Sequence, residues 1–420
     1  MKVAKIASAM LLSGLMSTGA YATNGYFASG YGIQSQGMGG VSIAFPQDSL
    51  AAASNPASIG FLGDRLDIGV TYFQPNRSST LTNTKAAGGA PNGYSDGTFS
   101  GNGTSSFLIP EFGVTKEINK EFSVGLNVYG NGGMNTTYPT IPAFGTSGAG
   151  VDLQQMFIAP TVSWKPVESQ SIGVSLLYVN QTFSATGLQN FASSNASLSP
   201  NNVTNNGNST TTGFSVQLGW LGKITNDLSL GLRYQPKISM SNMSNYSGLF
   251  AGGGSFDIPE TYGAGLAYKF TKDLTFAADY QRINYANVPA VANPLTNIPP
   301  MLGASNGPGF GWQNVNVYKL GANWRVNQDW AVRLGYNFNS QPIQSSQTLF
   351  NVLAPGVITQ QASVGATYYL GKEYEISGFY AHGFNQTVSG AYSIPNFGMS
   401  GNSSLKMYQD SVGLAFGWKF

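Results

Sequence analysis

Residue types that can carry out chemistry are few in this sequence. Its 420 residues include no cysteine and a single histidine, His382. A thiol nucleophile and a Cys/His metal site are therefore excluded, because the thiol and the ligands are missing. His382 is a candidate general base for a serine, but no acidic residue stands beside it in the sequence. We expect no metal, no cofactor and no enzymatic activity.

Three cations stand where they can meet an anionic ligand. Arg233, Lys237 and Arg333 occupy the strand phase that is opposite to the apolar side chains. A carboxylate would bind such cations through charge-assisted hydrogen bonds. The alternative is that they pair with acids inside the lumen, such as Asp279 and Glu375.

The composition narrows the class of protein. Only 9% of the residues are charged, against about 25% in an ordinary soluble domain. Hydrophobic residues make up 42% and aromatic residues 13%, which excludes a disordered chain. The net charge is +2 without a basic block, so we expect no nucleic-acid partner. A weakly charged chain with 54 glycines and many aromatics favours a membrane β-barrel.

The N-terminus indicates export. Residues 1–22 combine Lys2 and Lys5, an apolar core over residues 6–16 and the cleavage site Ala20-Tyr21-Ala22. This pattern predicts a secretory signal peptide, since the apolar core is too short to span a bilayer.

Strand periodicity dominates residues 64–420. Apolar residues alternate with small or polar ones, as in Tyr408–Phe420, and a period of two places each set on one face of a sheet. We count fourteen strands, with tight turns such as Glu117–Glu121 alternating with long loops near 76–105, 130–152, 185–211, 240–254, 285–314, 339–356 and 385–406. This alternation predicts an all-β fold, a 14-stranded antiparallel transmembrane barrel.

Residues 23–63 differ from the strands in composition. They are rich in small residues and nearly uncharged, with apolar side chains such as Phe27 that require burial. A fourteen-stranded barrel leaves a lumen that its own side chains cannot fill. We therefore expect residues 23–63 to form a small plug in the lumen, called the hatch below.

Two glycine- and proline-based motifs lie in the hatch. Gly37, Gly39 and Gly40 predict tight turns and close backbone approach. Asn55-Pro56-Ala57 follows a short helix expected over Asp48–Ala53, where the proline ends the helix. The motif is either a simple helix-ending turn or, because of its position in a plug, a candidate gate.

The hatch sequence NGYFASGYGIQSQGMGG…DSLAAASNPA resembles that of the FadL family, outer-membrane transporters of long-chain fatty acids and other hydrophobic compounds. The resemblance covers nearly the whole chain after residue 22, and it implies a fourteen-stranded barrel plugged by an N-terminal hatch. The further matching stretches are PEFGV (110–114), VYGNGGMN (128–135), FDIPETYGAGLAY (256–268), AADYQRINY (277–285), VYKLGANW (317–324) and RLGYNFNSQPI (333–343).

The resemblance also implies roles for individual residues. Asn55-Pro56-Ala57 matches a hatch motif that is tied to ligand passage. Gly130-Asn131-Gly132-Gly133 matches the place where the third strand kinks inward and opens a lateral exit in the wall. The alternative is that these glycines simply begin a loop. A binding groove is implied between the third and fourth long loops, where the apolar residues are Leu188, Phe191, Leu249 and Phe250.

The predicted function is passive outer-membrane transport of hydrophobic molecules, because a relay of apolar pockets keeps such a ligand out of water. The alternative is a general diffusion porin for small polar solutes. We expect a Gram-negative outer-membrane location, a monomer, contact with membrane lipid, and recognition by the barrel assembly machinery through the last strand, which ends in Phe420. The remaining candidate ligand contacts are Phe27, Phe73, Leu177, Phe183, Arg233 and Arg333.

Overall fold

Along the strands of this protein, exposed side chains alternate with buried ones, just as apolar residues alternate with polar ones in the sequence. In β7 (Ser209–Lys223), Leu218 is 45% exposed on the outer face, whereas the next side chain inward, Gln217, is fully buried. Exposed Leu, Val, Tyr and Trp side chains cover the outer face of the wall in the same way on the other strands. The period of two predicted from the sequence is therefore confirmed.

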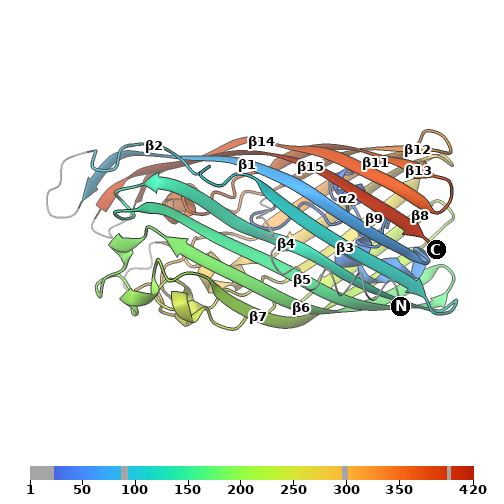
Figure 1. Cartoon of the computed structure of the whole chain (residues 1–420), viewed down its shortest axis with the longest axis horizontal. Coiled ribbons are helices and arrows are strands. Elements are labelled where there is room, and N and C mark those ends of the chain that lie inside the picture. The colour runs from blue at the N-terminus through green and yellow to red at the C-terminus, as the bar shows by residue number, and fades with distance from the viewer. Residues whose placement is uncertain (1–22, 87–92, 296–300, 395–398) are drawn as a thin grey trace.

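The computed structural model describes residues 23–86, 93–295, 301–394 and 399–420, so the predicted signal peptide lies outside the described residues. Within them, fourteen antiparallel strands follow one another around a ring, and β15 pairs with β1 to close it (Figure 1). The ring consists of β1 (Arg65–Ala86), β3 (Phe107–Glu117), β4 (Phe122–Thr140), β5 (Gly148–Val167), β6 (Gln170–Thr186), β7, β8 (Leu228–Gln235), β9 (Thr261–Lys269), β10 (Leu274–Ile283), β11 (Val315–Arg325), β12 (Trp330–Asn339), β13 (Gln360–Leu370), β14 (Tyr374–Ile394) and β15 (Met399–Lys419).

Short turns gather at the end of the barrel near the C-terminus, and long connections gather at the other end (Figure 1). The expected loops near 76–105, 130–152 and 385–406 are largely strand instead, because β1, β4, β14 and β15 continue well into them. In these parts the strands are rich in Gly, Asn and Ser and are held by backbone hydrogen bonds. The alternation of apolar residues stops there, so it cannot predict that the strands continue. The short β2 (Gly97–Ser100) pairs with β1 beyond the end of β3.

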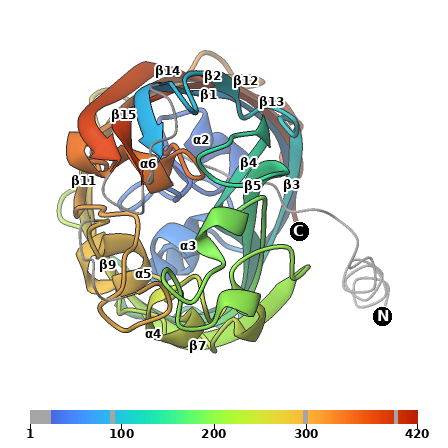
Figure 2. The same ribbon diagram turned by 90° about the vertical axis from the view of Figure 1, so that its left-hand side faces the viewer.

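The hatch lies inside the ring, as the view along the barrel shows (Figure 2). It contains α2 (Ile33–Gln36), α3 (Ala51–Ser54) and the 3-10 helix η1 (Pro56–Phe61). Most of its side chains are buried, including Tyr26 and Met38, which are fully so. Burial against the wall, rather than long regular helices, fixes this segment.

Glycines on the inner face of the wall make room for the hatch. A Cβ at Gly335 of β12 would lie 1.9 Å from the backbone nitrogen of Gly39. A Cβ at Gly219 of β7 would lie 2.0 Å from Oδ1 of Asn55. The hatch backbone at Gly39 and the Asn55 side chain therefore lie directly against the backbone of the wall.

The long connections carry short helical turns and, in the described residues, no helix long and apolar enough to cross a membrane. These turns are η2 (Gln189–Phe191), η3 (Pro200–Asn202), η4 (Ser244–Tyr246), α4 (Ala251–Gly254), η5 (Tyr285–Asn287), α5 (Pro289–Ala292), η6 (Ser345–Gln347) and α6 (Thr348–Asn351).

Candidate functional site

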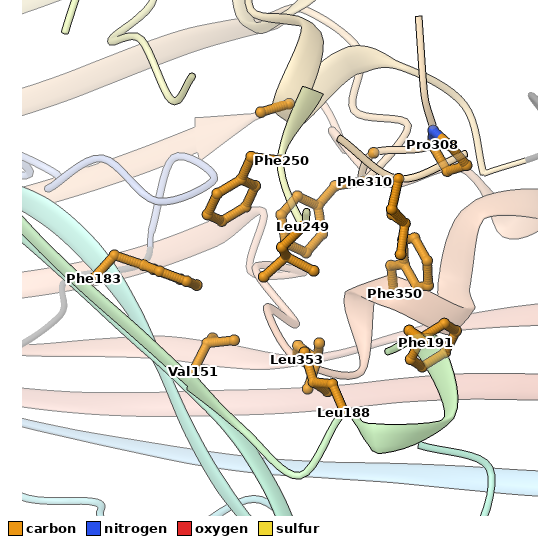
Figure 3. Close-up of a pocket in the computed structure, with 13 residues that line it drawn as sticks. Val151, Phe183, Leu188, Phe191, Leu249, Phe250, Pro308, Phe310, Phe350 and Leu353 are labelled. Atoms are coloured by element: carbon orange, nitrogen blue, oxygen red, sulfur yellow. The ribbon is translucent and has the colours of Figure 1, made fainter. Parts of the chain in front are cut away.

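The long connections enclose an apolar cavity of about 30 Å³ (Figure 3). Five residues predicted to contact ligand line it: Phe183 from β6, Leu188 and Phe191 from the following connection, and Leu249 and Phe250 before α4. The structure thus brings together the third and fourth long loops. The other lining residues are Val151, Ala290, Leu302, Pro308, Gly309, Phe310, Phe350 and Leu353.

Aromatic contacts hold this cavity together. The Phe183 and Phe250 ring centroids are 4.8 Å apart, and those of Phe191 and Phe350 are 5.4 Å apart, both edge-on. Edge-on pairs stabilise by about 0.5–1.5 kcal/mol beyond their burial. An engineered apolar cavity that binds benzene measures about 150 Å³, several times more, so these loops must part before a ligand enters.

The wall is interrupted between β3 and β4. Their pairing ends at Phe112 and Val128, although β3 continues along β1 to Phe107 and β4 continues along β5 to Thr140. Further along β4, Thr137 exchanges backbone hydrogen bonds with Gly101 and Gly103. Residues 107–111 and 129–136, all within the described chain, therefore face each other with no ladder pairing; this stretch is called the wall gap below.

The glycine motif of β4 forms one edge of the wall gap. The pairing of β4 with β5 shifts by one residue between Gly130 and Gly132, so that Asn131 is the extra residue of a bulge. Gly132 has φ 154°, which other residues rarely adopt. The alternative that these glycines begin a loop is wrong, because β4 continues for several residues beyond them.

The N-terminal part of the hatch pairs with this bulge. The Ala28 amide donates to the Asn131 carbonyl at 2.9 Å, and the Gly133 amide donates to the Tyr26 carbonyl at 3.0 Å. The Tyr31 hydroxyl donates to Oδ1 of Asn131 at 2.6 Å. Phe27 therefore forms a β-bridge with Gly132, and residues 26–28, called the hatch strand below, lie along the inner edge of the wall gap.

Asn55-Pro56-Ala57 lies deeper in the lumen. Asn55 ends α3 and caps η1, where its Oδ1 accepts from the Ala57 amide at 3.1 Å. Its Nδ2 donates to the carbonyls of Ile43 and Trp220, at 2.7 and 3.0 Å. The motif is thus a helix-ending turn that also anchors the hatch to β7.

The three predicted hatch glycines serve turns and close approach. Gly39 and Gly40 have φ values of 71° and 81°, in the left-handed region that glycine favours. Gly37 has an ordinary helical φ, but a Cβ there would lie 2.9 Å from the Cα of Gly365 in β13.

Buried ions attach the hatch to the wall below the wall gap. Arg65 donates to Asp67 at 2.6 Å and to Glu375 at 2.7 Å, and Lys419 pairs with Glu375 at 2.9 Å. Asp67 also accepts from the amide and hydroxyl of Ser49 in the hatch, at 2.8 and 2.6 Å.

Asp48 of the hatch lies close to this ion cluster. Burial raises the pKa of Asp48 to about 7, and the nearby Asp67 carboxylate adds to the shift while Arg65 opposes it. Asp48 therefore changes charge near neutral pH inside the barrel.

The predicted anion-binding cations are engaged elsewhere. Arg333 donates to Gln47 and Gln34 of the hatch, at 2.5 and 2.6 Å, and Lys237 pairs with Asp257 at 3.0 Å. Arg233 donates to the Thr261 hydroxyl at 3.0 Å. Lys237 therefore pairs with an acid, as in the alternative, whereas neither Arg233 nor Arg333 forms an ion pair with Asp279 or Glu375 in the described chain.

The two expected acid partners bind other groups. Asp279 accepts the hatch amides of Ser42 and Ile43, at 2.7 and 3.0 Å. Glu375 belongs to the cluster with Arg65 and Lys419 described above.

Phe27, Phe73 and Leu177 are buried but lie outside the first cavity. Phe73 packs with Phe107 and Ile109 beside the wall gap. It also lines a second cavity of about 20 Å³, with Gly25, Tyr26, Pro75, Arg77, Met134, Asn135, Trp312, Ala354, Pro355, Gly356 and Met407.

His382 has an acid partner in space although not in sequence. Its Nδ1 lies 2.8 Å from Oδ1 of Asp410 on the neighbouring strand, and the Tyr380 hydroxyl donates to the same oxygen at 2.7 Å. Tyr380 is 45% exposed on the outer wall, so this group lies away from both cavities.

Sequence reasoning missed several lining residues. Phe310, Phe350 and Leu353 come from the fifth and sixth long loops, where a glycine-rich stretch and a short apolar run gave the only signal. Arg77 was missed because strand alternation was not followed past Pro75, although Arg77 continues the inward phase of Phe73.

The comparisons with known proteins agree with this architecture. A crystal structure of a Pseudomonas aeruginosa FadL homologue superposes with a TM-score of 0.73 at 16% identity, covering 94% of this chain and 100% of that one. The Ralstonia pickettii toluene transporter TbuX gives 0.66 at 16% identity, with coverages of 93% and 99%. The Pseudomonas putida toluene transporter TodX gives 0.66 at 16%, with 95% and 100%. These likenesses show a shared fold.

At the level of sequence, no curated protein gives a significant match. The profile of one protein family, described as outer membrane protein transport protein (OMPP1/FadL/TodX), matches residues 9–416. That family is one of transport proteins. The chain therefore belongs to the OMPP1/FadL/TodX family of transport proteins, and its barrel lies in the outer membrane of a Gram-negative bacterium.

Proposed function

We propose that this protein carries hydrophobic molecules passively across the outer membrane and releases them sideways through the wall gap between β3 and β4. The observation that carries the proposal is the interruption of β3–β4 pairing, with hatch residues lying along its inner edge. Two similar structures are of toluene transporters, which supports a hydrophobic cargo.

Continuous apolar packing supports the route. One cluster of touching buried side chains includes Phe183 and Phe250 at the first cavity, and Tyr26, Phe27 and Tyr129 beside the wall gap. Leu177 belongs to the same cluster. A ligand moving along it keeps its apolar surface out of water, which is worth about 25 cal/mol per Å².

The moving part of the proposed gate is residues 23–31. Two backbone hydrogen bonds and the Tyr31 hydroxyl hold this stretch to β4, and Tyr285 and Gln409 donate to Asn24 and Thr23, both at 2.6 Å. The rest of the hatch is fixed by hydrogen bonds to buried carboxylates and by close glycine contacts. In this proposal Asn55-Pro56-Ala57 anchors the hatch, and the turns at Gly37, Gly39 and Gly40 keep it seated while the first residues withdraw.

A disulfide across the wall gap tests the lateral exit. A Cβ at Gly130 would lie 3.3 Å from Cγ2 of Ile109, close to the spacing that a disulfide needs, and the chain has no native cysteine. We expect the double variant Ile109→Cys/Gly130→Cys to lose toluene uptake when oxidised and to regain it on reduction. Each single variant is the matched control.

Unchanged uptake by the oxidised double variant would contradict lateral release. The same cells are tested with a small sugar, because a diffusion porin would pass the sugar and not the apolar ligand. Sugar uptake without toluene uptake would favour the porin alternative.

The proposal extends to the membrane and to assembly. The hatch and the wall gap both belong to one ring, which supports a monomer surrounded by lipid. The strand β15 alternates up to its end, and the exposed Phe420 follows it, which supports recognition by the barrel assembly machinery.

A further inference from the structure

Four strands continue beyond the rest of the wall at the end where the long connections gather (Figure 1). There β15 pairs with β14 on one side and with β1 on the other, and β1 pairs with β2. The pairing of β13 with β14 ends at Gly383, and that of β3 with β1 ends at Phe73. The part of the four strands that lies beyond these residues is called the outer sheet below.

The inner side of the outer sheet packs against the protein. Leu81 and Leu405 on this side are fully buried, and Met407 beside them is 2% exposed. The Thr348 hydroxyl of α6 donates to the Ser403 carbonyl at 2.9 Å, which joins the sheet to a long connection. The outer sheet is therefore supported from behind, and its outward side is a fixed surface.

The outward side carries two rows of polar side chains that run across all four strands. The strand register places four hydroxyl residues next to one another in the first row, which consists of Thr98, Thr80, Ser404 and Ser389. The second row consists of Ser100, Ser78, Lys406 and Thr387. Neighbours within a row are about 4.8 Å apart, and the two rows are about 7 Å apart, as in any sheet.

These rows offer many neutral hydrogen bonds and one positive charge. Thr80 bonds to Thr98 at 2.9 Å, and Ser389 bonds to Ser404 at 3.0 Å. Because a hydroxyl is both a donor and an acceptor, each bonded pair keeps a donor and several acceptors for a ligand. Lys406 is exposed and forms no ion pair within the described residues.

The rows lie next to the part of the wall that faces lipid. On the same side, exposed Tyr72, Tyr380 and Tyr408 come next toward the middle of the barrel, followed by exposed Val70 and Leu414. Aromatic side chains mark the boundary between hydrocarbon and head groups on membrane barrels, and long connections mark the extracellular side. The rows are therefore at the level of the head groups of the outer leaflet.

We infer that the outer sheet binds the phosphorylated saccharide head group of an outer-leaflet glycolipid, with the hydroxyl rows on the sugar and Lys406 on a phosphate. A sugar presents many hydroxyls on a compact ring, which matches a surface of neutral donors and acceptors. Sites for a phosphate alone are built from clusters of cations instead. Lipopolysaccharide, the main lipid of this leaflet, has such a head group. The inference does not depend on which cargo the barrel carries.

The experiment measures the affinity of the purified full-length barrel for two lipids by native mass spectrometry in detergent. The lipids are rough lipopolysaccharide, which has core sugars, and phosphatidylglycerol, which has a phosphate but no saccharide. We expect the wild type to bind lipopolysaccharide at least about tenfold more tightly, because only this lipid can use the hydroxyl rows.

The variant Thr80→Val/Thr98→Val removes two hydroxyls while keeping the shape of both side chains. We expect it to bind lipopolysaccharide about tenfold more weakly and phosphatidylglycerol as before. The matched control is Thr182→Val/Thr210→Val, which removes a bonded hydroxyl pair from β6 and β7 and keeps the wild-type affinity. We expect Lys406→Gln to weaken both lipids several-fold, because both have a phosphate.

Assembly of each variant is checked by heat-modifiable gel mobility. If the double variant in the first row does not assemble, Ser389→Ala/Ser404→Ala of the same row replaces it. Equal binding of the two lipids by the wild type overturns the inference, and so does an equal lipopolysaccharide affinity of the first-row variant and the control. Unchanged binding of lipopolysaccharide by Lys406→Gln overturns the role of Lys406 on the phosphate.

Discussion

At the scale of single residues, Asp48 links hatch stability to pH. Its pKa lies near 7 in the folded protein against 3.8 for the ordinary group, so the folded state retains a proton that the unfolded state has lost between those values. The contribution of this carboxyl to stability therefore falls as pH rises from about 4 to 7 and is level above that range.

The variant Asp48→Asn tests this coupling. We expect its apparent melting temperature to lose the part of the decline between pH 4 and 7 that is due to this carboxyl. Thermal unfolding followed by tryptophan fluorescence at each pH measures it, with the wild type as reference. Identical pH profiles for the two proteins would show that Asp48 ionises normally.

Gly219 tests the close contact between wall and hatch. The substitution Gly219→Ala places a Cβ 2.0 Å from Oδ1 of Asn55, so the anchor must shift, at a cost of about 1–3 kcal/mol. We expect a lower melting temperature and a higher ion leak in planar bilayers. At Gly378 a Cβ would lie 3.3 Å from the flexible Leu414 side chain and at an ordinary contact distance of 3.5 Å from the Gly413 carbonyl, which makes Gly378→Ala the control. Equal leaks in both variants would argue against a tight seat.

At the scale of elements, the hatch segment that lies along β4 is the part that we propose to move. Tyr31→Phe removes the hydrogen bond to Asn131 while leaving the bond from Asn131 to Gln155 in place. The loss of about 0.5–1.5 kcal/mol raises local opening about two- to tenfold. We expect faster hydrogen exchange at the Ala28 amide, measured by mass spectrometry.

The control for this exchange experiment is Tyr138→Phe. Its hydroxyl bonds to Ser79, away from the hatch strand. Acceleration at Ala28 in the control as well, or in neither variant, would show that the Tyr31 hydroxyl does not hold the hatch strand.

The elements also show what the sequence predicts and what it does not. Apolar alternation located the strands where one face meets lipid, and the tight turns such as Glu117–Glu121 were right. It ended β4 too early, because beyond Gly130 the strand is held by backbone pairing between small and polar residues. The pairing of Ala28 with Asn131 joins segments about a hundred residues apart, and no local pattern reports such contacts.

The candidate site was predictable to a similar degree. Leu188, Phe191, Leu249 and Phe250 line one cavity at the place where the family resemblance implies a groove, and their contact with a ligand stays a prediction. The charged residues were predicted less well. Strand alternation predicts that their side chains point into the lumen. It does not predict their partners, because these depend on how the hatch folds: Arg333 donates to two hatch glutamines, and Arg77 has no acid partner in the described residues.

At the scale of the whole molecule, we expect a change at the end of the last strand to affect assembly in the membrane but not the stability of the folded barrel. Phe420 is 50% exposed, and its ring packs on Trp418 with centroids 4.9 Å apart. We expect Phe420→Ala to change the melting temperature little, as for most surface changes. Its amount in the outer membrane should fall several-fold, because the proposed assembly signal is lost.

Immunoblots of outer-membrane fractions and melting of the purified protein measure these two effects. Phe270→Ala is the control, since Phe270 is also exposed and packs on one aromatic neighbour, Phe276. An equal loss of both variants from the membrane would show that the terminal position has no special role.

The ring closes between its first and last strands, so the formation of the closed barrel depends on the last part of the chain to be made. The hatch is joined directly to β1, whose partner β15 is made last, and Arg65 shares Glu375 with Lys419 across that junction. The same ion cluster thus holds Asp67, which binds the hatch, and Lys419 of the last strand. Seating of the hatch and closure of the wall are therefore energetically coupled, and a chain without β15 lacks both the closing strand and one member of the cluster.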